Sequence, residues 1–561
     1  MSTAIDLRGV RFTYRGAARP ALDGVDLTVA PGEFVVLVGP SGAGKSTLCY
    51  ILNGLVPQFL RGRLEGSVTI LGEPAAGRKV SALAEKVGLV FQDFESQLFS
   101  TNVELEVAFA PENFGVDPAE IRRRVRECLA TVGLTGLEHR EPATLSGGQK
   151  QRLAIASVLS MEPRILVMDE PTTDLDPLGK EAVFAVARRL RERGLTLVIA
   201  EHETEEAAAA DRVVVLHEGR VVAQGTPREV LTRADWLEEL GVQPLGAAQI
   251  TARLGLPPAL TVEEAVEVLR EAGYRVDPAA LVELRERDRR RAAALGEPVI
   301  EVRDLEHRYP NGVAALQGVN LTIRRGEFVA LVGQNGSGKT TLVKHLNGLL
   351  QPTGGEVRVA GVPTAGQSVL QLGRRVGYVF QNPDHQIFAE TVYDEVAFGP
   401  RNHGLPEPEV QARVEEALAA VGLTGREEED PFAMTRGERQ RVAVASVLAT
   451  RPEVIILDEP TTGLDYREQR QMMELVRRLN EQGHTILCVT HTMWVVAEYA
   501  HRTVVMRDGR IWMDGPTREV LAREEELTAA SLKPPQLVRI TGRLGGTLLS
   551  LEECLHALRK G

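Results

Sequence analysis

The chain has 561 residues and a formal net charge of −12 at pH 7, a length that allows two large domains with a core each. The acidic balance argues against nucleic acid as the main partner and against electrostatic attachment to anionic lipid. No apolar stretch approaches the ~18 residues needed to span a bilayer, and the N-terminus lacks the basic and apolar regions of a signal peptide, so we expect a chain that is soluble by itself.

Cysteine usage points to a reducing cytoplasm. The four cysteines are widely separated and form no C-x-x-C pair. We therefore expect them to be buried small hydrophobes and not a disulfide or metal framework. They are Cys49, Cys128, Cys488 and Cys554.

The first strong pattern along the chain is a phosphate-binding loop at residues 39–46, after an apolar strand predicted at 34–38. A second match to G-x-x-x-x-G-K-[ST] stands at 333–340, after a strand predicted at 328–332. Glycines let backbone N–H groups wrap phosphate oxygens at a helix N-terminus, the lysine reaches the β/γ-phosphates, and the Ser or Thr hydroxyl binds Mg²⁺. The residues predicted to bind ATP and Mg²⁺ in this way are Gly39, Gly42, Gly44, Lys45, Ser46 and Thr47 in the first loop and Gly333, Gly336, Gly338, Lys339, Thr340 and Thr341 in the second.

The two loops belong to a duplication of most of the chain. Lys45 corresponds to Lys339, an offset of 294, and beyond the loop the offset settles at 289, as for Asp169 and Asp458. Continuous apolar runs at 165–168, 195–200, 454–457 and 485–489 alternate with helical patterns, which is typical of a parallel sheet buried on both faces. The sequence thus predicts an α/β fold with two tandem P-loop nucleotide-binding domains.

Carboxylate pairs end one predicted strand in each half. Asp169 and Glu170 follow the run 165–168, and Asp458 and Glu459 follow 454–457. The aspartates are predicted to bind Mg²⁺, and the glutamates to orient or deprotonate the attacking water.

A glutamine and a histidine also follow predicted strands in each half. Gln92 and Gln381 are candidates to contact Mg²⁺ or the attacking water, and His202 and His491 are candidates to sense the γ-phosphate. A lone histidine at a strand end is more often structural, but the repeated placement favours a functional role.

A small C-terminal appendage repeats after each nucleotide-binding core, because residues 249–255 resemble 539–545 and each segment leads into a helical pattern. The predicted organisation is a first ATPase domain at 1–240, its appendage at 241–277, a linker at 278–298, a second ATPase domain at 299–525 and its appendage at 526–561. The linker holds the arginine-rich run 285–291. Interleaved acids at Glu283, Glu286 and Asp288 favour a solvated helix over a nucleic-acid patch.

The segment 145–152 is the most discriminating. Ser146, Gly147, Gly148 and Gln149 precede a helical pattern, as in an anion-binding helix N-terminus. With this segment the chain resembles an ABC-type ATPase with two nucleotide-binding domains, each with a helical subdomain, over nearly its full length.

The resemblance implies that the two domains pair head to tail, so that ATP on one phosphate loop is closed over by the signature segment of the other domain. It also implies that Tyr14 and Tyr309 stack on adenine, although either is also compatible with ordinary strand packing. Asp176 and Asp465 would lie in the loops that couple the two sites.

The second signature departs from the family pattern. Thr435 keeps a hydroxyl and Gly437 keeps one glycine, but Arg436 replaces a glycine and Glu438 replaces a glutamine. By head-to-tail pairing, the altered signature closes the site built on Lys45, and the regular one closes the site built on Lys339. We hypothesise that the Lys339 site hydrolyses ATP faster.

The segment 380–400 and its first-half counterpart 91–99 are similar to ATPases of energy-coupling factor (ECF) importers, the group for vitamin, cobalt and nickel uptake. Phe99, Ile387 and Phe388 are interpreted as a groove for a helix of a partner, with ordinary core packing as the alternative. The resemblance implies a membrane T component, a substrate-binding S component, and a peripheral location on the cytoplasmic face of the cell membrane.

A second class of function stays open, because soluble tandem ABC ATPases act on ribosomes or in DNA repair. The short, mixed-charge connector and the lack of zinc-binding cysteines or long coiled coils disfavour it, and an exporter ATPase is disfavoured by 381–388. The transported molecule (a vitamin, a thiamine precursor, cobalt or nickel) is not specified by this chain.

Overall fold

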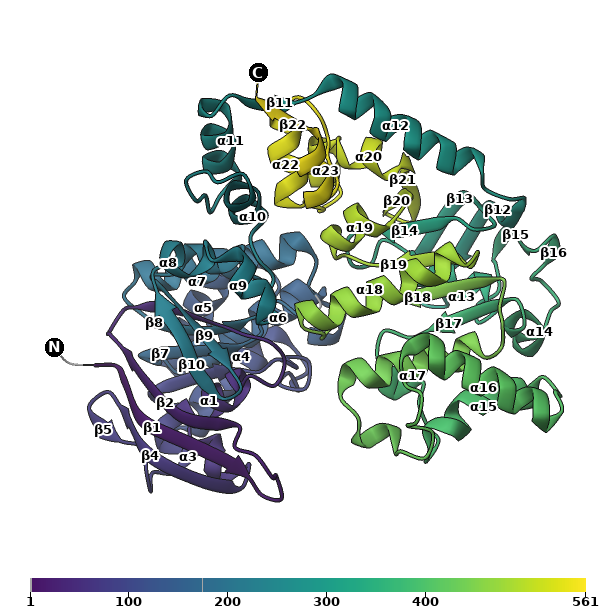
Figure 1. The fold of residues 1–561 in the computed structure, drawn as a ribbon. Helices are drawn as coiled ribbons and strands as arrows, with labels where there is room; N and C mark the ends of the chain where they lie inside the picture. The colour runs from purple at the N-terminus through teal and green to yellow at the C-terminus, as the bar shows by residue number, and fades with distance from the viewer. Residues whose placement is uncertain (1–2, 174, 561) are drawn as a thin grey trace. The chain divides into compact units, whose positions relative to one another are not determined.

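The computed structural model describes residues 3–173 and 175–560, and the chain divides into two compact units, both α/β (Figure 1). The first takes in the chain up to Ala252, with the short segments Pro258–Leu260 and Asp465–Arg467. The second takes in Arg253–Pro257, Thr261–Leu464 and the chain from Glu468 onward. The expectation of two large domains with separate cores is confirmed.

A six-stranded sheet forms the centre of the first unit. Its strands run in the order β10 (Arg220–Gly225), β9 (Arg212–His217), β3 (Phe34–Val38), β8 (Thr196–Glu201), β7 (Ile165–Asp169) and β6 (Val87–Val90). All pairs are parallel except β10 with β9. Every residue of β3, β7 and β8 is buried, because helices cover one face of the sheet and a helix together with an antiparallel sheet covers the other. Burial on both faces explains the unbroken apolar runs in the sequence. The predicted parallel sheet is confirmed, and the antiparallel edge strand is an addition to it.

A four-stranded antiparallel sheet precedes and flanks the phosphate loop. Its order is β2 (Leu22–Val29), β1 (Ile5–Tyr14), β4 (Gly62–Ile70) and β5 (Glu73–Pro74). Its inner face alternates with solvent-facing residues along β2, as expected for a half-buried strand. This sheet places Tyr14 at the end of β1.

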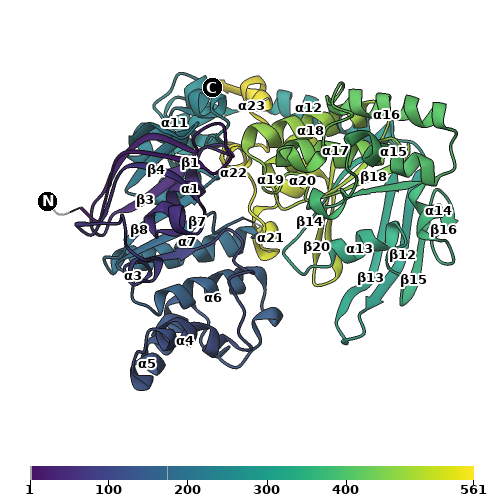
Figure 2. The same ribbon diagram turned by 90° about the horizontal axis from the view of Figure 1, so that it is seen from below.

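Some helices of the first unit pack on its sheets, and others form a separate helical subdomain. Three helices of the subdomain pack on one another, namely α4, α5 and α6, and they project away from the sheets in Figure 2. Asp117 caps α5 and Gly133, at φ 71°, ends it in the left-handed conformation that glycine tolerates. The helices are α1 (Lys45–Leu52), α2 (Leu55–Gln58), α3 (Val80–Ala84), α4 (Val103–Asn113), α5 (Pro118–Val132), α6 (Gly147–Leu159), α7 (Pro177–Glu192), α8 (Pro227–Leu231), α9 (Ala234–Glu239) and α10 (Gly246–Arg253), with 3₁₀ turns at Pro142–Thr144 and Glu206–Ala209.

The second unit repeats both sheets. Its six-stranded sheet has the order β17 (Val376–Val379), β18 (Val454–Asp458), β19 (Thr485–Val489), β14 (Phe328–Val332), β20 (Arg502–Arg507) and β21 (Arg510–Pro516). Its antiparallel sheet has the order β13 (Ala314–Arg324), β12 (Pro298–Arg308), β15 (Gly354–Val359) and β16 (Val362–Pro363). The repeated strand order in the two units is the structural form of the duplication.

Helices of the second unit follow the same plan, with α15, α16 and α17 as the helical subdomain. The helices are α13 (Lys339–Leu346), α14 (Val369–Gly373), α15 (Val392–Asn402), α16 (Glu407–Val421), α17 (Arg436–Leu448), α18 (Tyr466–Glu481), α19 (Met493–Tyr499), α20 (Thr517–Leu521), α21 (Glu524–Ala529), α22 (Gln536–Arg543) and α23 (Leu551–Ala557), with 3₁₀ turns at Pro383–His385 and Pro431–Ala433.

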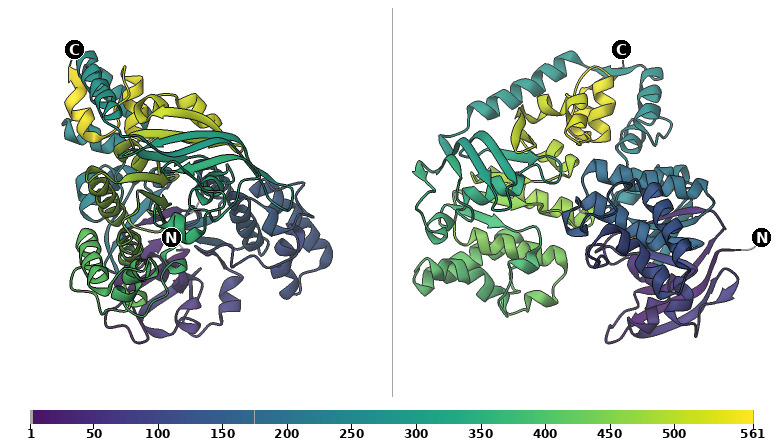
Figure 3. Two further views of the ribbon diagram at one scale, coloured as in Figure 1. Left: turned by 90° about the vertical axis from the view of Figure 1, so that its right-hand side faces the viewer. Right: turned by 180° about the vertical axis from the view of Figure 1, so that it is seen from behind.

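The segment after the first nucleotide-binding core packs within the second unit. It forms α11 (Val262–Glu271), β11 (Tyr274–Val276) and α12 (Pro278–Ala293). Strand β11 pairs antiparallel with β22 (Leu558–Lys560), and α11 contacts α22. Figure 3 shows the teal α11 and α12 beside the yellow C-terminal elements in both views. The arginine-rich segment is thus a helix, as expected, and all four cysteines are free and buried, as expected.

Candidate functional site

Each phosphate loop lies between a central strand and the helix that follows it, β3 and α1 in the first unit and β14 and α13 in the second. The glycine before the lysine is left-handed in both, with φ 100° at Gly44 and 104° at Gly338. A Cβ at either position would lie 2.6 Å from a backbone carbonyl oxygen, so only glycine fits there. The loops thus present a backbone surface suited to phosphate.

The two lysines of the loops are buried and reach back across their own loop. Lys45 Nζ lies 2.8 Å from Gly39 O, and Lys339 Nζ lies 2.8 Å from Gly333 O. Burial is the largest influence on Lys45 and lowers its pKa. Each ammonium group is therefore held at the mouth of the loop, where phosphate oxygens bind.

The catalytic candidates of the first unit lie together at the C-terminal end of β7. Glu170 Oε1 lies 2.6 Å from His202 Nε2 and 3.7 Å from Lys45 Nζ. Gln92 Nε2 donates to Glu170 Oε2 at 2.8 Å. Burial acts to raise the pKa of Glu170, but His202 and Lys45 outweigh it and lower the pKa to about 2. Glu170 is therefore ionised at neutral pH.

Asp169 and Ser46 together provide oxygen atoms of the kind that bind a hard cation. Ser46 Oγ donates to Asp169 Oδ1 at 3.0 Å, and Asp169 Oδ2 is buried without a hydrogen-bond partner among the described residues. Hydroxyl and carboxylate oxygens are the ligands that Mg²⁺ takes in phosphate sites. Ser46 and Asp169 therefore fit the predicted metal role.

The second unit assembles a similar centre with different contacts. His491 Nδ1 lies 2.9 Å from Glu459 Oε1, and the His491 backbone N–H donates to Glu459 Oε2 at 3.3 Å. Burial opposes ionisation of Glu459, but His491 and Lys339 prevail and lower its pKa. Thr340 lies exposed at the first turn of α13, and Gln381 follows β17.

Tyr378 is a site residue that the sequence reasoning missed. Its hydroxyl donates to Asp458 Oδ2 at 2.5 Å. The available signal was a polar side chain inside the strand Val376–Val379. Leu89 occupies the corresponding place in the first unit, where a tyrosine from a different element, Tyr50 of α1, interacts with Asp169 instead.

Both glutamates that are predicted to be catalytic adopt a left-handed backbone, with φ 47° at Glu170 and 49° at Glu459. This conformation is uncommon for a residue other than glycine, and such strain concentrates at functional sites. It turns the chain sharply after the aspartate, so that adjacent carboxylates serve different partners.

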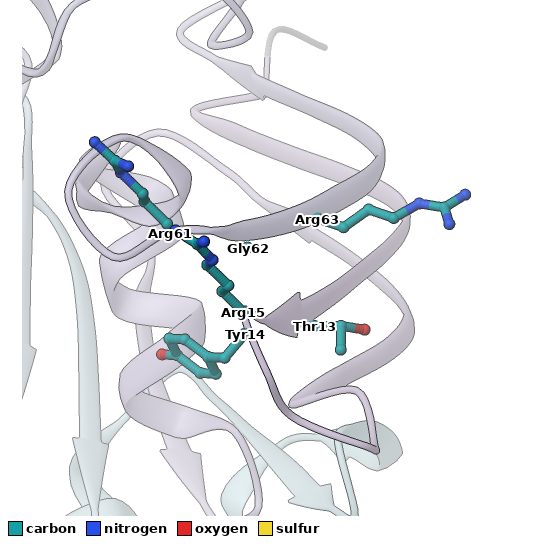
Figure 4. Close-up of a pocket in the computed structure, with 6 residues that line it drawn as sticks. All are labelled: Thr13, Tyr14, Arg15, Arg61, Gly62 and Arg63. Atoms are coloured by element: carbon teal, nitrogen blue, oxygen red, sulfur yellow. The ribbon is translucent and has the colours of Figure 1, made fainter.

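The two predicted base-stacking tyrosines lie beside the phosphate-loop helices. The Tyr14 hydroxyl is 3.0 Å from Thr47 Oγ1, and the Tyr309 hydroxyl is 3.1 Å from Thr341 Oγ1. In the first unit Tyr14 lines a pocket, at which Arg61, just before β4, and Arg63, on β4, extend in opposite directions (Figure 4). The pocket is lined by Thr13, Tyr14, Arg15, Arg61, Gly62 and Arg63.

The regular signature segment begins α6 with a complete capping box. Gln149 N donates to Ser146 Oγ at 3.3 Å, and Ser146 N donates to Gln149 Oε1 at 3.0 Å. Gly147 and Gly148 form the first turn of the helix. Asp176 caps α7, where it accepts from Gly179 N at 2.8 Å.

The altered signature keeps the same helix start on α17. Glu438 N donates to Thr435 Oγ1 at 3.3 Å, and Thr435 N donates to Glu438 Oε2 at 2.8 Å. Arg436 lies over Gly463, where a Cβ would come within 2.6 Å of the guanidinium carbon. Glu438 also pairs with Arg426 at 2.5 Å. The alteration thus changes charge at the helix start and not its fold, and Asp465 lies just before α18.

An exposed aromatic pair repeats on the helical subdomains. Phe99 packs edge to face on Phe109 with ring centroids 4.5 Å apart, and Phe388 packs in the same way on Phe398 at 4.7 Å. Phe99 and Phe388 are 62% and 59% exposed. Ile387 is buried, so its inclusion in the predicted groove was wrong: it belongs to the core, because the chain turns its side chain inward.

Comparison with known proteins places both halves in one family. The family model described as ABC transporter matches residues 22–173 and 316–462. The chain is 54% identical to an ABC transporter ATP-binding protein of Caldanaerobacter subterraneus subsp. tengcongensis, over 99% of each chain. It is 42% identical to another of Methanosarcina acetivorans, over 96% of this chain and 90% of the relative.

Among solved structures, cbiO1 from Clostridium perfringens, described as part of the ABC transporter complex cbiONQ, is 36% identical. The match covers 42% of this chain and 94% of that one, with a TM-score of 0.39. Within the described ranges, no helix combines the length and apolar character needed to cross a membrane.

Proposed function

Because the chain belongs to the ABC transporter family and is an ATP-binding, ATP-hydrolysing member of it, we propose that it powers an importer of the ECF type. In this proposal it acts through a membrane T component and a substrate-binding S component, from the cytoplasmic face of the membrane. The transported compound is a vitamin, a thiamine precursor, or cobalt or nickel.

The observation that carries the proposal is the repeated exposed aromatic pair. A buried glutamate fixes the loop before each pair: Glu106 Oε2 accepts from Phe99 N at 3.0 Å, and Glu395 Oε2 accepts from Phe388 N at 3.0 Å. In both units this hydrogen bond fixes the backbone of an exposed phenylalanine. The repeated arrangement favours a binding role, since exposed aromatic surface marks interaction sites. An apolar helix of a membrane partner fits such a surface.

The aromatic pair is also connected to the catalytic centre. In the first unit, Gln97 Oε1 accepts from Phe91 N at 3.2 Å, and Gln92, which binds Glu170, lies in the same short segment as Phe99. In the second unit, Gln386 Oε1 accepts from Phe380 N at 3.1 Å. Movement of a partner helix against Phe99 or Phe388 would therefore displace the loop that carries the catalytic glutamine.

The chemistry proposed for each site follows from the contacts described above. Ser46, Gln92 and Asp169 in the first unit, and Thr340, Gln381 and Asp458 in the second, would hold Mg²⁺, which when bound would supply positive charge to the phosphate oxygens.

The residues of the chain supply the remaining functions. Lys45 and Lys339 hold the phosphates in the loops, and Glu170 and Glu459 stay ionised, so they accept a hydrogen bond from the attacking water and orient it. His202 and His491 hold these carboxylates in place. The two domains pair head to tail within the chain, each site being closed by the signature of the other domain.

The test is affinity purification of the full chain from mild-detergent extracts of its native membranes, with co-purifying proteins identified by mass spectrometry. We expect one T-like integral membrane protein and one small substrate-binding membrane protein. The variant Phe99→Ala/Phe388→Ala is expected to lose both.

The matched control is Phe59→Ala, which truncates another exposed phenylalanine, 72% exposed and outside the aromatic pairs. It should retain both partners. Recovery of ribosomes, or of nothing integral to the membrane, would contradict the importer proposal and favour a soluble tandem ATPase.

A further inference from the structure

A pair of histidines stands behind the base-stacking tyrosine of the second unit, and the first unit has no counterpart to it. His307 on β12 and His345 on α13 are both buried, with 7% and 0% of their surface exposed. Their rings meet at a centroid distance of 4.7 Å, and His345 Nε2 lies 3.1 Å from His307 Nδ1. In the first unit, the corresponding positions hold Phe12 and Ile51.

The two histidines, Thr341 and Tyr309 form a closed ring of contacts. The His307 ring packs edge to face on Tyr309 at 4.7 Å. His345 Nδ1 lies 2.7 Å from Thr341 O, and Thr341 Oγ1 lies 3.1 Å from the Tyr309 hydroxyl. Tyr309 is thus held at its ring and at its hydroxyl by one connected set of groups.

The equivalent ring of contacts in the first unit lacks its polar links. Phe12 packs on Tyr14 at 4.8 Å and the Tyr14 hydroxyl meets Thr47, as in the second unit. Phe12 and Ile51, however, can only pack together, since neither carries a hydrogen-bonding group. The two units therefore offer the same tyrosine with and without histidine support.

Backbone carbonyls fix the protonation pattern of the pair. A carbonyl oxygen only accepts, so His345 Nδ1, facing Thr341 O, carries a proton and donates it. His307 Nδ1 lies 3.2 Å from Gln351 O and carries a proton for the same reason. The unprotonated Nε2 of a neutral His345 therefore accepts from His307 Nδ1–H.

A second proton on His345 breaks this arrangement. It would enter at Nε2 and place two N–H groups head to head across 3.1 Å, so that His307 has to move from its position against Tyr309. Burial, and then repulsion from His307, lower the pKa of His345, although the carbonyls of Thr341 and Gln351 favour its charged form. The polar groups that the structure records against the two rings are the carbonyls of Thr341 and Gln351, and Tyr309 packs on His307. His345 is thus neutral at neutral pH.

We propose that His307 and His345 are positioning residues that hold Tyr309 in its base-binding position, and that they make nucleotide affinity at the second site, unlike the first, fall in acid. The inference rests on the proposed function, because it takes Tyr309 to contact the nucleotide base.

The test measures binding of a fluorescent ATP analogue to the full chain, with one site disabled at a time. Lys45→Ala leaves the second site to be read, and Lys339→Ala leaves the first. On going from about pH 7.5 to about pH 5.5, we expect the second site to weaken about fivefold more than the first, an effect the size of one aromatic contact. Titration of the nucleotide phosphates affects both sites and is removed by this comparison.

Two variants in the Lys45→Ala background decide the role of the pair. His307→Phe/His345→Ile installs the residues of the first unit and should abolish the additional acid sensitivity. His345→Gln keeps hydrogen-bonding groups without a titrating ring, so it should bind as the parent does at pH 7.5 and lose the acid sensitivity. His345→Gln also tests the proposal if the double variant does not fold.

The outcomes separate the inference from the proposed function. Acid sensitivity that persists in His345→Gln, or equal sensitivity of the two sites in the parent, would overturn the inference while ATP binding stands. Failure of the Lys45→Ala chain to bind nucleotide at any pH would instead overturn the assignment of the second site, and the inference with it.

Discussion

At the scale of single residues, the two signature segments differ in charge while keeping the same cap. Ser146 with Gln149 and Thr435 with Glu438 form equivalent capping boxes. Arg436 adds a guanidinium group to the first turn, and it lies over Gly463. The sites are therefore expected to differ in rate because of side chains near the phosphate and not because one helix start is lost.

This difference predicts unequal effects of the two glutamate substitutions. On the proposed pairing, Glu459→Gln disables the site closed by the regular signature and should remove most of the steady-state ATPase rate of the chain. Glu170→Gln should remove the smaller part, although each carboxylate contributes about 100-fold or more at its own site. Equal losses, measured on the full chain at saturating ATP, would contradict the asymmetry.

A restoring variant serves as the control for that comparison. In the Glu459→Gln background only the site built on Lys45 turns over, and Arg436→Gly/Glu438→Gln gives it a regular signature. We expect its ATPase rate to rise several-fold, by about the amount of one charged contact near phosphate. An unchanged rate would show that Arg436 and Glu438 do not limit hydrolysis.

A carboxyl group with a buried oxygen, on Glu206 in the segment that follows β8, predicts a pH dependence of stability in the first unit. Burial, and then Glu203, raise the pKa of Glu206 to about 7, and Glu206 Oε2 has no hydrogen-bond partner among the described residues. The folded state thus keeps a proton that the unfolded state loses near pH ~4.3. The protonated Glu206 therefore contributes its full stabilisation of the folded state below pH ~4.3, and this contribution is lost as the pH rises through about 7.

We expect the first unit to lose about 1 kcal/mol of unfolding free energy between pH ~6 and pH ~8, and Glu206→Gln to reduce that loss. Thermal unfolding at both pH values measures it. The second unit is an internal control, because Val495 occupies the corresponding place. A Glu206→Gln chain with the full pH dependence of the parent would refute the assignment.

Local patterns predicted the parts of the site that depend on neighbouring residues in sequence. The phosphate loops and the strands ending in Asp169 and Asp458 follow directly from the order of residues. For contacts between distant residues, such as Tyr378 with Asp458, the sequence shows at most a polar residue inside a strand and does not identify its partner. Ile387 and Phe388 are both large and apolar, and only the path of the folded chain decides that one is buried and the other exposed.

At the scale of elements, a buried ion network joins α12 to the C-terminal appendage of the second unit. Arg518 binds Glu553 through two contacts of 2.8 Å and Asp288 at 2.9 Å, and it also donates to Thr547 O at 2.8 Å. Arg287 binds Glu553 from α12 at 2.6 Å. The helix predicted as a solvated linker thus has one face that holds the appendage in place.

Removing the central arginine should destabilise this assembly. Arg518→Met leaves Glu553 buried with fewer partners, and loss of one member of a buried pair costs about 3 kcal/mol or more. We expect a lower unfolding temperature for the second unit and little change in the first. Asp288→Asn, which removes a more exposed partner, should cost about 1 kcal/mol or less. Equal effects of the two variants would contradict the central role of Arg518.

At the scale of the whole molecule, the order of segments along the chain does not match the order of compact units. The segment 261–298 follows the first nucleotide-binding core in sequence, yet it belongs to the second unit. Residue composition favoured a linker at 278–298 because it is rich in charge, and nothing local to β11 identifies its partner strand.

This arrangement predicts where the chain can be divided. A fragment 261–561 should be more stable than a fragment 299–561, because the shorter one lacks β11, α11 and α12 and leaves β22 and α22 uncovered. Urea unfolding of both fragments measures the difference. Equal midpoints would show that residues 261–298 act only as a connector.

The pairing of β11 with β22 also bears on how the chain is completed during synthesis. Tyr274 aligns with Lys560, so β11 emerges from the ribosome long before its partner strand exists. Until residue 560 has been made, the edge of β11 has open backbone groups, a condition that exposes a chain to wrong pairing. The second unit therefore reaches its full structure only when translation of this segment is finished, and a chaperone that shields an unpaired strand edge would have its greatest effect in that interval.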